Sequence, residues 1–419
     1  MRRILFLVPV LLMTLHAQAQ SATYTLLGRI SVARLDGILK KGRAQFLPAD
    51  SRPKAYRWPA AIKAKYPVNI YRVRYQTVVP EWHNQSTFAS GLIAIPIVVD
   101  AHSLPVVCYQ HGTVYGKYEV PSYAFSRSNP SGFSQYAGAY ETRLMVAQYA
   151  GQGYVVEAAD YLGMGDSPLP EAYTVKGAEQ AACLGLYKAA KVFLAKNGIL
   201  KSKLFLAGWS AGGLVTTAFL AKLQSQGIRV TATFTASSPN DPFAGLNTWL
   251  YHPRQHEAIW ENTLLGLTLF SYQHYDDRPG LAKSVLKPQY YKSFRAIYDR
   301  QYQSAAQLSR IFQSLVQPRV PLLAYLRKRY ANPAYFADSL YGKLLARSQT
   351  IRYLFQSPVR MYYGSDDEAI PVPLGTLAAH YQRAMGSDSI HAIEVRGGSH
   401  RGTFLTAVSR SLPWFNRHK

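Results

Sequence analysis

Short apolar runs alternate with longer segments of helical spacing along most of the chain, a pattern typical of α/β proteins. The apolar runs have the length and composition of strands buried on both faces of a sheet. They lie at residues 105–110, 154–160, 203–209, 230–237, 359–363 and 390–395. The helical segments lie at residues 134–152, 174–197, 211–226 and 373–385 and after residue 401. Because this alternation requires right-handed crossovers, we expect an α/β fold with a mostly parallel central sheet flanked by helices.

The segment before the first buried run has a different pattern. Residues 69–79 and 86–99 each alternate apolar and polar positions and are rich in β-branched side chains, and residues 80–85 between them resemble a turn. Together they predict an antiparallel entry to the sheet. Residues 20–67 mix apolar and basic positions, and we interpret them as an N-terminal extension that packs on the core.

A second departure lies in the later half of the chain. From residue 240 to about residue 350 the strand pattern disappears, and the segment is helical in texture, rich in leucine and tyrosine and interrupted by prolines. We therefore expect a helical cap at residues 242–350, inserted between two parts of an α/β core at residues 68–241 and 351–419.

The first 19 residues have the features of a cleaved signal peptide. Arg2 and Arg3 precede an apolar run at residues 4–15, and Ala17-Gln18-Ala19 forms a small-x-small cleavage sequence. The run is too short to span a bilayer, and no second apolar segment of spanning length follows it. We expect an exported protein, periplasmic or secreted, rather than one held by an uncleaved anchor.

Composition and charge narrow the possible partners. The chain has 419 residues, of which 48% are hydrophobic and only 17% charged, so it can bury a sizeable core. Two cysteines, Cys108 and Cys183, lie in apolar contexts and predict buried thiols, with a single bridge left open. The formal net charge is +24, and +22 without the leader. Basic stretches such as residues 327–329 are compatible with electrostatic association with an anionic surface, membrane or polymer, but a solvated basic face is favoured. No nucleic-acid motif accompanies the charge, so nucleic acid is not expected as a partner.

One stretch carries the strongest chemical signature. The predicted strand 203–209 runs into Gly208-Trp209-Ser210-Ala211-Gly212, where only very small residues would let a strand and a helix approach around a serine at a sharp turn. The pentapeptide alone is equally compatible with an ordinary glycine-rich turn. Its position between a buried strand and a helix favours Ser210 as a nucleophile.

A nucleophilic serine needs a base and a carboxylate that holds the base, and both follow the cap. His400 follows the last predicted strand, and the pattern G-x-x-D-x-x-[VI]-P, read from Gly364, selects Asp367 as the acid over its neighbour Asp366. Asp241 is a further acid, but its Pro-Asn-Asp-Pro context is more typical of a helix cap. Because the carboxyl ends of parallel strands share one edge, these side chains are expected to converge.

Acyl transfer also requires two N–H donors for the oxyanion. The Ala211 N–H, at the start of the helix after Ser210, is one candidate. The sequence His111-Gly112-Thr113 follows a buried strand, and we expect the Thr113 N–H to be the second donor. His111 itself is interpreted as a structural support rather than a base.

These motifs together resemble the secretory lipase type of α/β-hydrolase over roughly residues 68–419. The resemblance rests on Tyr109-Gln110-His111-Gly112-Thr113, on Asp160-Tyr161-Leu162-Gly163-Met164-Gly165, on Gly208-Trp209-Ser210-Ala211-Gly212-Gly213 and on the helical insertion before the acid. It implies a Ser210–His400–Asp367 triad, an acyl pocket shaped by the cap, and carboxylic esters as substrates. The tyrosine-rich second half of the cap matches no motif of that family, so no acyl-chain length is predicted.

Other chemistries are disfavoured. His252 and His256 have the spacing of metal ligands on one helical face, but Pro253 lies between them and no carboxylate completes the set. No glycine pattern of a nucleotide site follows a strand. We therefore predict no metal and no cofactor.

Two alternative functions stay open. A peptidase on the same triad would need carboxylates in the cap to anchor a free terminus, and Glu257 and Glu261 are candidates. A catalytically silent fold that binds the cell envelope is consistent with the basic charge, although all three triad positions are filled. The main prediction is an exported serine hydrolase that acts on small-molecule or lipid esters. The oligomeric state is not predicted.

Overall fold

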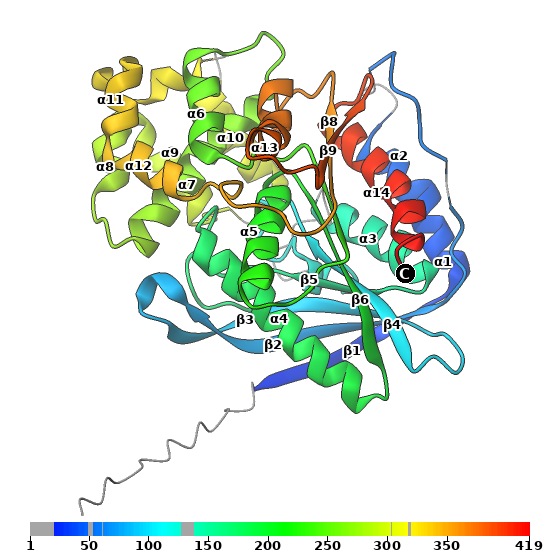
Figure 1. Cartoon of the computed structure of the whole chain (residues 1–419). Coiled ribbons are helices and arrows are strands. Elements are labelled where there is room, and N and C mark those ends of the chain that lie inside the picture. The colour runs from blue at the N-terminus through cyan, green and yellow to red at the C-terminus, as the bar shows by residue number, and fades with distance from the viewer. Residues whose placement is uncertain (1–20, 49–52, 61, 127–137, 303, 317–319) are drawn as a thin grey trace, which may run out of the picture.

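A twisted sheet lies at the centre of the structure, a computed structural model that describes residues 21–48, 53–60, 62–126, 138–302, 304–316 and 320–419 (Figure 1). The predicted signal peptide lies outside the described residues. Within the described residues the sheet has nine strands, in the order β1-β2-β3-β5-β4-β6-β7-β8-β9. They are β1 (Ala22–Ile30), β2 (Val68–Val79), β3 (Gln85–Pro96), β4 (Ser103–Gln110), β5 (Val155–Ala159), β6 (Leu200–Trp209), β7 (Ala232–Ala236), β8 (Val359–Gly364) and β9 (Ile390–Val395).

The strand directions divide the sheet into two parts. Strands β1, β2 and β3 pair antiparallel, and β3 pairs antiparallel with β5. From β5 through β4, β6, β7 and β8 to β9, every pairing is parallel. The predicted mostly parallel sheet with an antiparallel entry is therefore confirmed. The strand β1 was not predicted, and it makes part of the N-terminal extension an edge of the sheet itself.

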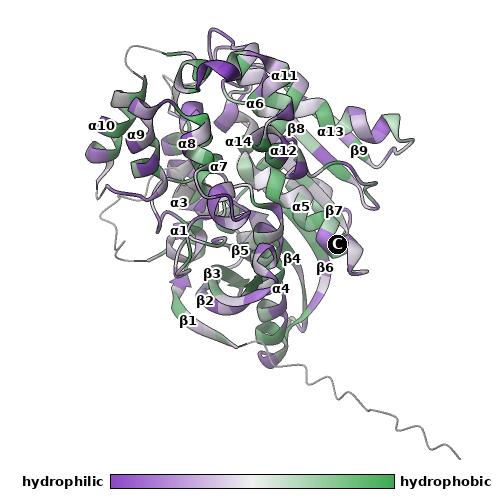
Figure 2. Cartoon of the chain, turned by 90° about the vertical axis from the view of Figure 1, so that its left-hand side faces the viewer, coloured by the Kyte–Doolittle hydropathy of each residue, from purple (hydrophilic) through white to green (hydrophobic). Residues whose placement is uncertain are grey.

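Helices cover both faces of the sheet. One face carries α4 (Lys176–Lys196), α5 (Ala211–Ser225) and α13 (Val372–Ala384), and the other carries α1 (Val32–Gly37), α2 (Arg43–Phe46), α3 (Gly138–Tyr149) and α14 (His400–Asn416). Each face forms its own apolar core, because the side chains of the central strands alternate between the two layers. The α5 helix beside β7 is among the most apolar segments in Figure 2.

A helical cap connects β7 to β8, as the chain pattern predicted. Its helices are α6 (Pro242–Tyr251), α7 (Asn262–Tyr275), α8 (Leu281–Val285), α9 (Pro288–Tyr298), α10 (Ala305–Val316), α11 (Pro333–Asp338) and α12 (Leu340–Arg347). In Figure 1 these helices gather on the left, above the helices that cover the sheet. Their apolar side chains join the core that contains α4 and α5, so the cap and this face of the sheet share one continuous hydrophobic interior.

The N-terminal extension reaches the far end of the chain. The Phe46 ring packs edge-on against the rings of Trp209 and Phe404, each 5.3 Å away between centroids. The Tyr56 hydroxyl donates to the carbonyl of Gly402 at 3.0 Å, near the start of α14. The extension therefore supports the helix that carries His400.

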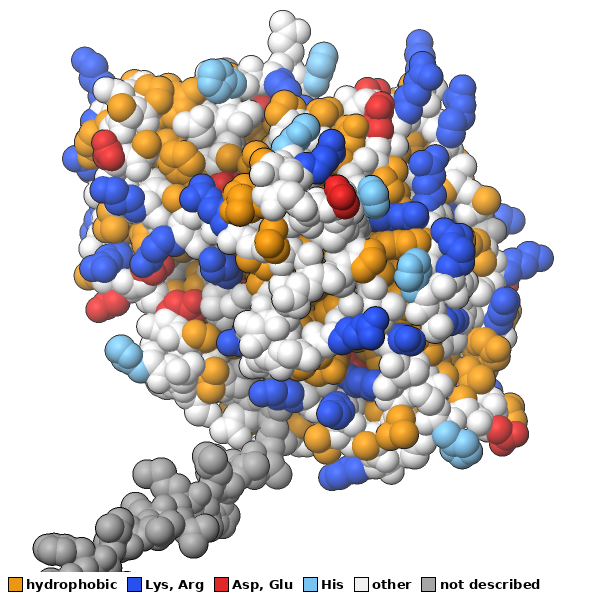
Figure 3. All heavy atoms as spheres, viewed as in Figure 1, with side chains coloured by type: hydrophobic (Ala, Val, Ile, Leu, Met, Phe, Trp, Pro, Cys, Tyr) orange, Lys and Arg blue, Asp and Glu red, His pale blue; other side chains and the backbone are white. Residues whose placement is uncertain are grey.

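The surface charges and the two cysteines can be compared with what the composition predicted. Lys and Arg side chains are spread over the whole face in Figure 3 rather than gathered into one patch, and acidic side chains on it are few. Cys108 and Cys183 are both buried and free. Among the described residues, no helix is both long enough and apolar enough to span a membrane.

Candidate active site

The chain turns sharply at Ser210, which joins β6 to α5. Ser210 has a φ of +56° and a ψ of −130°, an uncommon conformation for a residue with a side chain. Its N–H donates to the carbonyl of Ala236, at the end of β7, at 2.9 Å. The turn places Ser210 at the carboxyl end of a central parallel strand.

The two glycine positions around Ser210 have no room for a side chain. A Cβ on Gly208 would lie 2.1 Å from Thr216 Oγ1, and a Cβ on Gly212 would lie 2.1 Å from the carbonyl oxygen of Gln110. Both distances are far shorter than any van der Waals contact. The first turn of α5 therefore approaches β6 and β4 as closely as it does only because both positions lack a side chain, as expected from the sequence.

Asp367 and His400 lie together beyond the ends of β8 and β9. His400 Nδ1 is 3.1 Å from Asp367 Oδ1 and 3.3 Å from Oδ2, and both side chains are buried. The N–H groups of Ala369 and Ile370 also donate to Asp367 Oδ1, each at 2.9 Å. Burial by itself raises the pKa of Asp367, but the charge and hydrogen bond of His400 and the Ile370 N–H outweigh it and hold the pKa below its ordinary value.

The ring of His400 is held beside the serine turn. Its centroid lies 4.9 Å from the ring of Trp209, and Trp209 Nε1 donates to the His400 carbonyl at 3.0 Å. His400 Nε2 is buried and has no hydrogen-bond partner among the described residues, so no hydrogen bond joins it to Ser210. Hydrogen bonds between a nucleophile and its base are often long or poorly aligned until substrate binds.

The start of the last helix differs slightly from expectation. The sequence pattern suggested a loop through Arg401, but α14 begins at His400. The hydroxyl of Ser399 accepts the N–H of Gly402 at 3.2 Å and caps the helix at this earlier start. Glu368 Oε2 accepts the N–H of His400 at 2.9 Å, so the first turn of α14 is also fixed to the loop after β8 that carries Asp367, called the acid loop below.

The alternative acids are placed elsewhere. Asp366 is exposed, and its carboxylate accepts a hydrogen bond from the neighbouring Ser365. Asp241 is the N-cap of α6, where it accepts the N–H of Ala244 at 3.0 Å. Among these three carboxylates, only that of Asp367 is hydrogen-bonded to His400.

The two proposed oxyanion donors border the same space. A small cavity behind the serine turn is lined by Thr113, on the loop after β4, and by Ala211, at the start of α5. Within the described part of the chain, neither the Thr113 N–H nor the Ala211 N–H is hydrogen-bonded. The loop is brought there by the register of β4 on β6, which pairs Gln110 with Gly208.

His111 supports this loop. Its Nδ1 lies 2.8 Å from the carbonyl oxygen of Gly112, and its ring stacks on Tyr161 at 4.3 Å between centroids. Burial lowers the pKa of His111 to about 4, so the ring is neutral at neutral pH and its proton is assigned to Nδ1. This geometry suits a structural support and gives His111 no contact with the His400 pair.

The comparison with known families decides the classification. The model of the alpha/beta hydrolase family matches residues 111–409, which include the Ser210 turn, the cap and both later loops. This chain belongs to the α/β-hydrolase family. A search of curated proteins found no match.

Solved structures share the fold of this α/β-hydrolase. A protein from Legionella pneumophila classed provisionally as a hydrolase is 22% identical, with a TM-score of 0.78 over 94% of this chain and 97% of that one. The rice cell wall degrading esterase LipA from Xanthomonas oryzae is 17% identical, with a TM-score of 0.75 over 95% and 98%. Candida antarctica lipase A is 17% identical, with a TM-score of 0.61 over 80% and 73%. These likenesses establish the fold.

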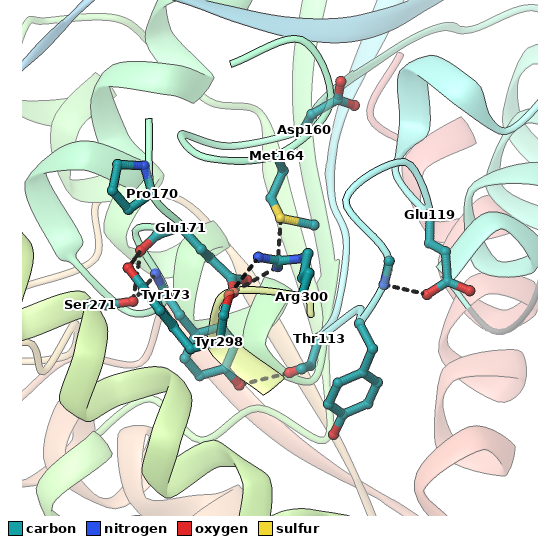
Figure 4. Close-up of polar contacts among 12 residues, drawn as sticks. Thr113, Glu119, Asp160, Met164, Pro170, Glu171, Tyr173, Ser271, Tyr298 and Arg300 are labelled. Carbon is teal, nitrogen blue, oxygen red and sulfur yellow. Dashed lines mark hydrogen bonds and ion pairs between the residues drawn. The ribbon is translucent and has the colours of Figure 1, made fainter. Parts of the chain in front are cut away.

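A polar network joins the loop after β4, which carries the proposed oxyanion donor Thr113 and is called the oxyanion loop below, to the cap of this hydrolase (Figure 4). Thr113 Oγ1 lies 2.7 Å from the Tyr173 hydroxyl, and the Tyr173 N–H donates to Ser271 Oγ on α7 at 2.9 Å. Ser271 and Tyr298 both donate to the carbonyl of Glu171 at 2.8 Å. Because the partners of Thr113 and Glu171 come from distant segments of the chain, sequence patterns gave no indication of this network.

An ion pair lies at the centre of the same network. Arg300 Nη2 is 2.7 Å from Glu171 Oε2, and the two side chains are only 13% and 8% exposed. Arg300 also contacts Met164 Sδ at 2.8 Å, on the loop after β5 (Figure 4). Burial raises the pKa of Glu171, and the nearby Arg300 guanidinium acts against that rise. The pair ties the end of α9 to the loop beneath the cap.

We expect Arg300→Met to lower the free energy of unfolding by about 3 to 5 kcal/mol, because it leaves the Glu171 carboxylate buried without its counter-charge. The double variant Arg300→Met/Glu171→Gln is expected to recover most of this loss, since it removes both charges. Urea denaturation monitored by circular dichroism measures the free energy of unfolding of the single and the double variant. A single variant within 1 kcal/mol of the wild type, or a double variant no more stable than the single, would contradict the expectation.

The two cap carboxylates named as a terminus anchor share one pocket. Glu257 and Glu261 line a pocket of about 400 Å³ beside the acid loop. Arg254 lies between them and that loop, with Nε 3.3 Å from Glu257 Oε1 and Nη1 donating to the Asp367 carbonyl at 2.9 Å. Glu261 is buried, and burial raises its pKa well above the ordinary value. The pocket thus has one carboxylate already paired and one that favours its neutral form.

The described residues contain no group of three or more His, Cys, Asp or Glu side chains arranged to hold a metal ion. His252 and His256, the pair with metal-ligand spacing, are both exposed beyond the end of α6.

Proposed function

We propose that this α/β-hydrolase is an exported serine esterase or lipase that cleaves carboxylic esters through an acyl-enzyme. One observation carries the proposal: the strained Ser210 turn, the buried His400–Asp367 pair and two unpaired N–H groups all lie at one edge of the sheet. The names of two structural relatives, an esterase and a lipase, support the class of substrate. The sequence of the first 19 residues supports export.

The reaction would proceed by acyl transfer. Ser210 Oγ attacks the ester carbonyl carbon while His400 Nε2 takes the hydroxyl proton and then gives it to the departing alcohol. Asp367 orients the imidazole and stabilises its charged form. The N–H groups of Thr113 and Ala211 hold the negative oxygen of the tetrahedral intermediate. Water, activated by His400, then releases the acid and frees Ser210.

A peptidase on the same residues is the second candidate. Its support is the placement of Glu257 and Glu261 in one pocket next to the acid loop, where a free amino terminus would meet carboxylates. Arg254 weakens this candidate, because it already pairs with Glu257 and brings a positive charge to the pocket wall. The ester hypothesis is therefore preferred.

We expect the purified protein to hydrolyse p-nitrophenyl esters with a kcat/KM more than about tenfold above that for aminoacyl p-nitroanilides, a preference of at least ~1.4 kcal/mol in the transition state. A series of graded acyl chains measures the size of the acyl pocket. Intact mass spectrometry after treatment with a fluorophosphonate is expected to show one adduct, on Ser210. Preferred turnover of the anilides would favour the peptidase, and absence of any adduct would favour a silent binding module.

A further inference from the structure

A buried carboxyl group lies directly behind the oxyanion loop. Glu141, on α3, is fully buried, and its Oε1 accepts the N–H of Gly112 at 2.8 Å. A carboxyl group enclosed in a protein interior is unfavourable unless it makes a specific interaction. This one is directed at the backbone of the residue that precedes Thr113.

The position of this hydrogen bond matters for the direction of the Thr113 N–H. The peptide unit between Gly112 and Thr113 is planar and trans, so its N–H points opposite to its carbonyl. His111 Nδ1 holds that carbonyl at 2.8 Å, and Glu141 holds the N–H on the other side of Gly112. Gly112 is thus fixed at both ends by buried side chains, and the orientation of the next N–H follows from this.

Gly112 has little other restraint on its rotation. It lacks a side chain, and a Cβ there would meet Trp209 at 3.2 Å and Ser210 Cβ at 3.3 Å. The position therefore has to be small, and a glycine backbone is more flexible than any other. An external hydrogen bond can supply the order that glycine lacks, and Glu141 supplies it from the first turn of α3.

We propose that Glu141 is a positioning residue of the oxyanion hole, which fixes the loop after β4 so that the Thr113 N–H points at the developing oxyanion. The inference rests on the proposed ester hydrolysis. Glu141 contacts neither the reacting atoms nor Ser210 in this arrangement. It acts through Gly112, whose N–H its carboxyl oxygen accepts.

The surroundings of Glu141 favour its neutral form. The titratable or charged groups that face it are Tyr109 from β4, Tyr161 from the loop after β5 and Arg401 from α14. Burial raises the pKa of Glu141 to about 8, although the Gly112 N–H, Tyr109 and Arg401 lower it. Below this pH the group is neutral. Above it, a negative charge one residue from Thr113 would repel the oxyanion.

Two variants test the proposal. Glu141→Gln keeps a neutral oxygen for the Gly112 N–H, so we expect kcat within about threefold of the wild type, since an equal acceptor remains. Glu141→Leu removes the acceptor at similar volume, and we expect kcat to fall by about 10- to 100-fold with KM nearly unchanged, because the loss is confined to the transition state. Rates are normalised to the fraction of sites that react with a fluorophosphonate.

The pH profile gives the second readout. The wild type is expected to lose kcat as the pH rises through about 8, and Glu141→Gln to lack this alkaline decline. Because the folded pKa lies above the ordinary value of 4.5, the wild type should also lose stability relative to Glu141→Gln as the pH rises from 4.5 to 8. A merely structural role would change stability but not the kcat profile.

The outcomes separate the two proposals. If the wild type neither hydrolyses esters nor reacts with the fluorophosphonate, the proposed function fails. If the wild type is active but Glu141→Leu keeps its kcat per reactive site, the positioning role fails. If Glu141→Leu does not fold, the pH profile of Glu141→Gln decides, and an unchanged alkaline decline overturns the proposal.

Discussion

Ser210→Ala is expected to lower kcat for p-nitrophenyl esters by about a million-fold, to a residual rate that comes from substrate binding and the oxyanion N–H groups alone. The physical reason is that alanine leaves no hydroxyl group at the apex of the β6–α5 turn. Ser210 lies at this apex, and the helix can approach the strand as closely as it does there only because Gly208 and Gly212 have no side chains. Single-turnover kinetics and fluorophosphonate labelling measure the loss.

The matched control is Ser225→Ala, at the other end of the same helix. Ser225 is exposed, and its hydroxyl donates only to the carbonyl of Lys222 at 2.8 Å. We expect this variant to keep the wild-type kcat and the adduct. A Ser210→Ala enzyme that retained more than a tenth of the activity would exclude the proposed nucleophile.

Asp367→Asn is the second large effect, with an expected loss in kcat of about 10,000-fold. The asparagine amide preserves the size of the side chain but favours the wrong tautomer of His400 and removes the charge that stabilises the imidazolium. Steady-state rates across a pH series measure the effect. The adduct at Ser210 should form slowly rather than vanish, because the serine itself is unchanged.

Asp366→Asn is the control, because it is the neighbouring carboxylate that the chain pattern disfavoured. Asp366 is exposed and does not contact His400, so we expect kcat to stay within about twofold, the usual range for exposed side chains. If Asp366→Asn shows the large loss and Asp367→Asn does not, the assignment of the acid is wrong.

Asp367 also predicts a dependence of stability on pH. Its folded pKa lies below the ordinary value of 3.8, so the ionised form stabilises the fold. This contribution is fully present above pH 3.8 and is lost as the pH falls through the lower, folded pKa. The stability difference between the wild type and Asp367→Asn should therefore shrink in acid, as measured by thermal unfolding between pH 5 and pH 2.

Local sequence patterns were sufficient to predict the order of the strands and helices, because each of these elements is determined mainly by residues close together in the chain. The apolar runs that end at residues 110 and 209 are buried on both sides, and the small residues around Ser210 are needed within one turn of it. Such features repeat at the spacing of strands and helices, and the sequence alone therefore determined the α/β class, the cap and the candidate Ser210, Asp367 and His400.

Tertiary contacts decided the rest. The strand β1 was missed because it is an edge strand, whose mixed polar and apolar positions give no clear alternation, and its place depends on pairing with β2. Tyr173 and Arg300 were missed because their partners lie on other segments. Glu141 is an acidic residue inside an apolar helical segment, which is unusual enough to attract notice. Nothing in that segment indicates that Gly112 is its partner.

What the sequence by itself determined about this hydrolase is which residues lie at the ends of its parallel strands. Burial and turn geometry depend on residues close together in the chain, so local patterns reveal them. What only the tertiary structure decided is how those residues are held. Glu141 meets Gly112 across 29 positions and Arg300 meets Glu171 across 129, and such distances along the chain leave no periodic trace. Hydrogen bonds between distant segments exist only once the strands and helices have packed.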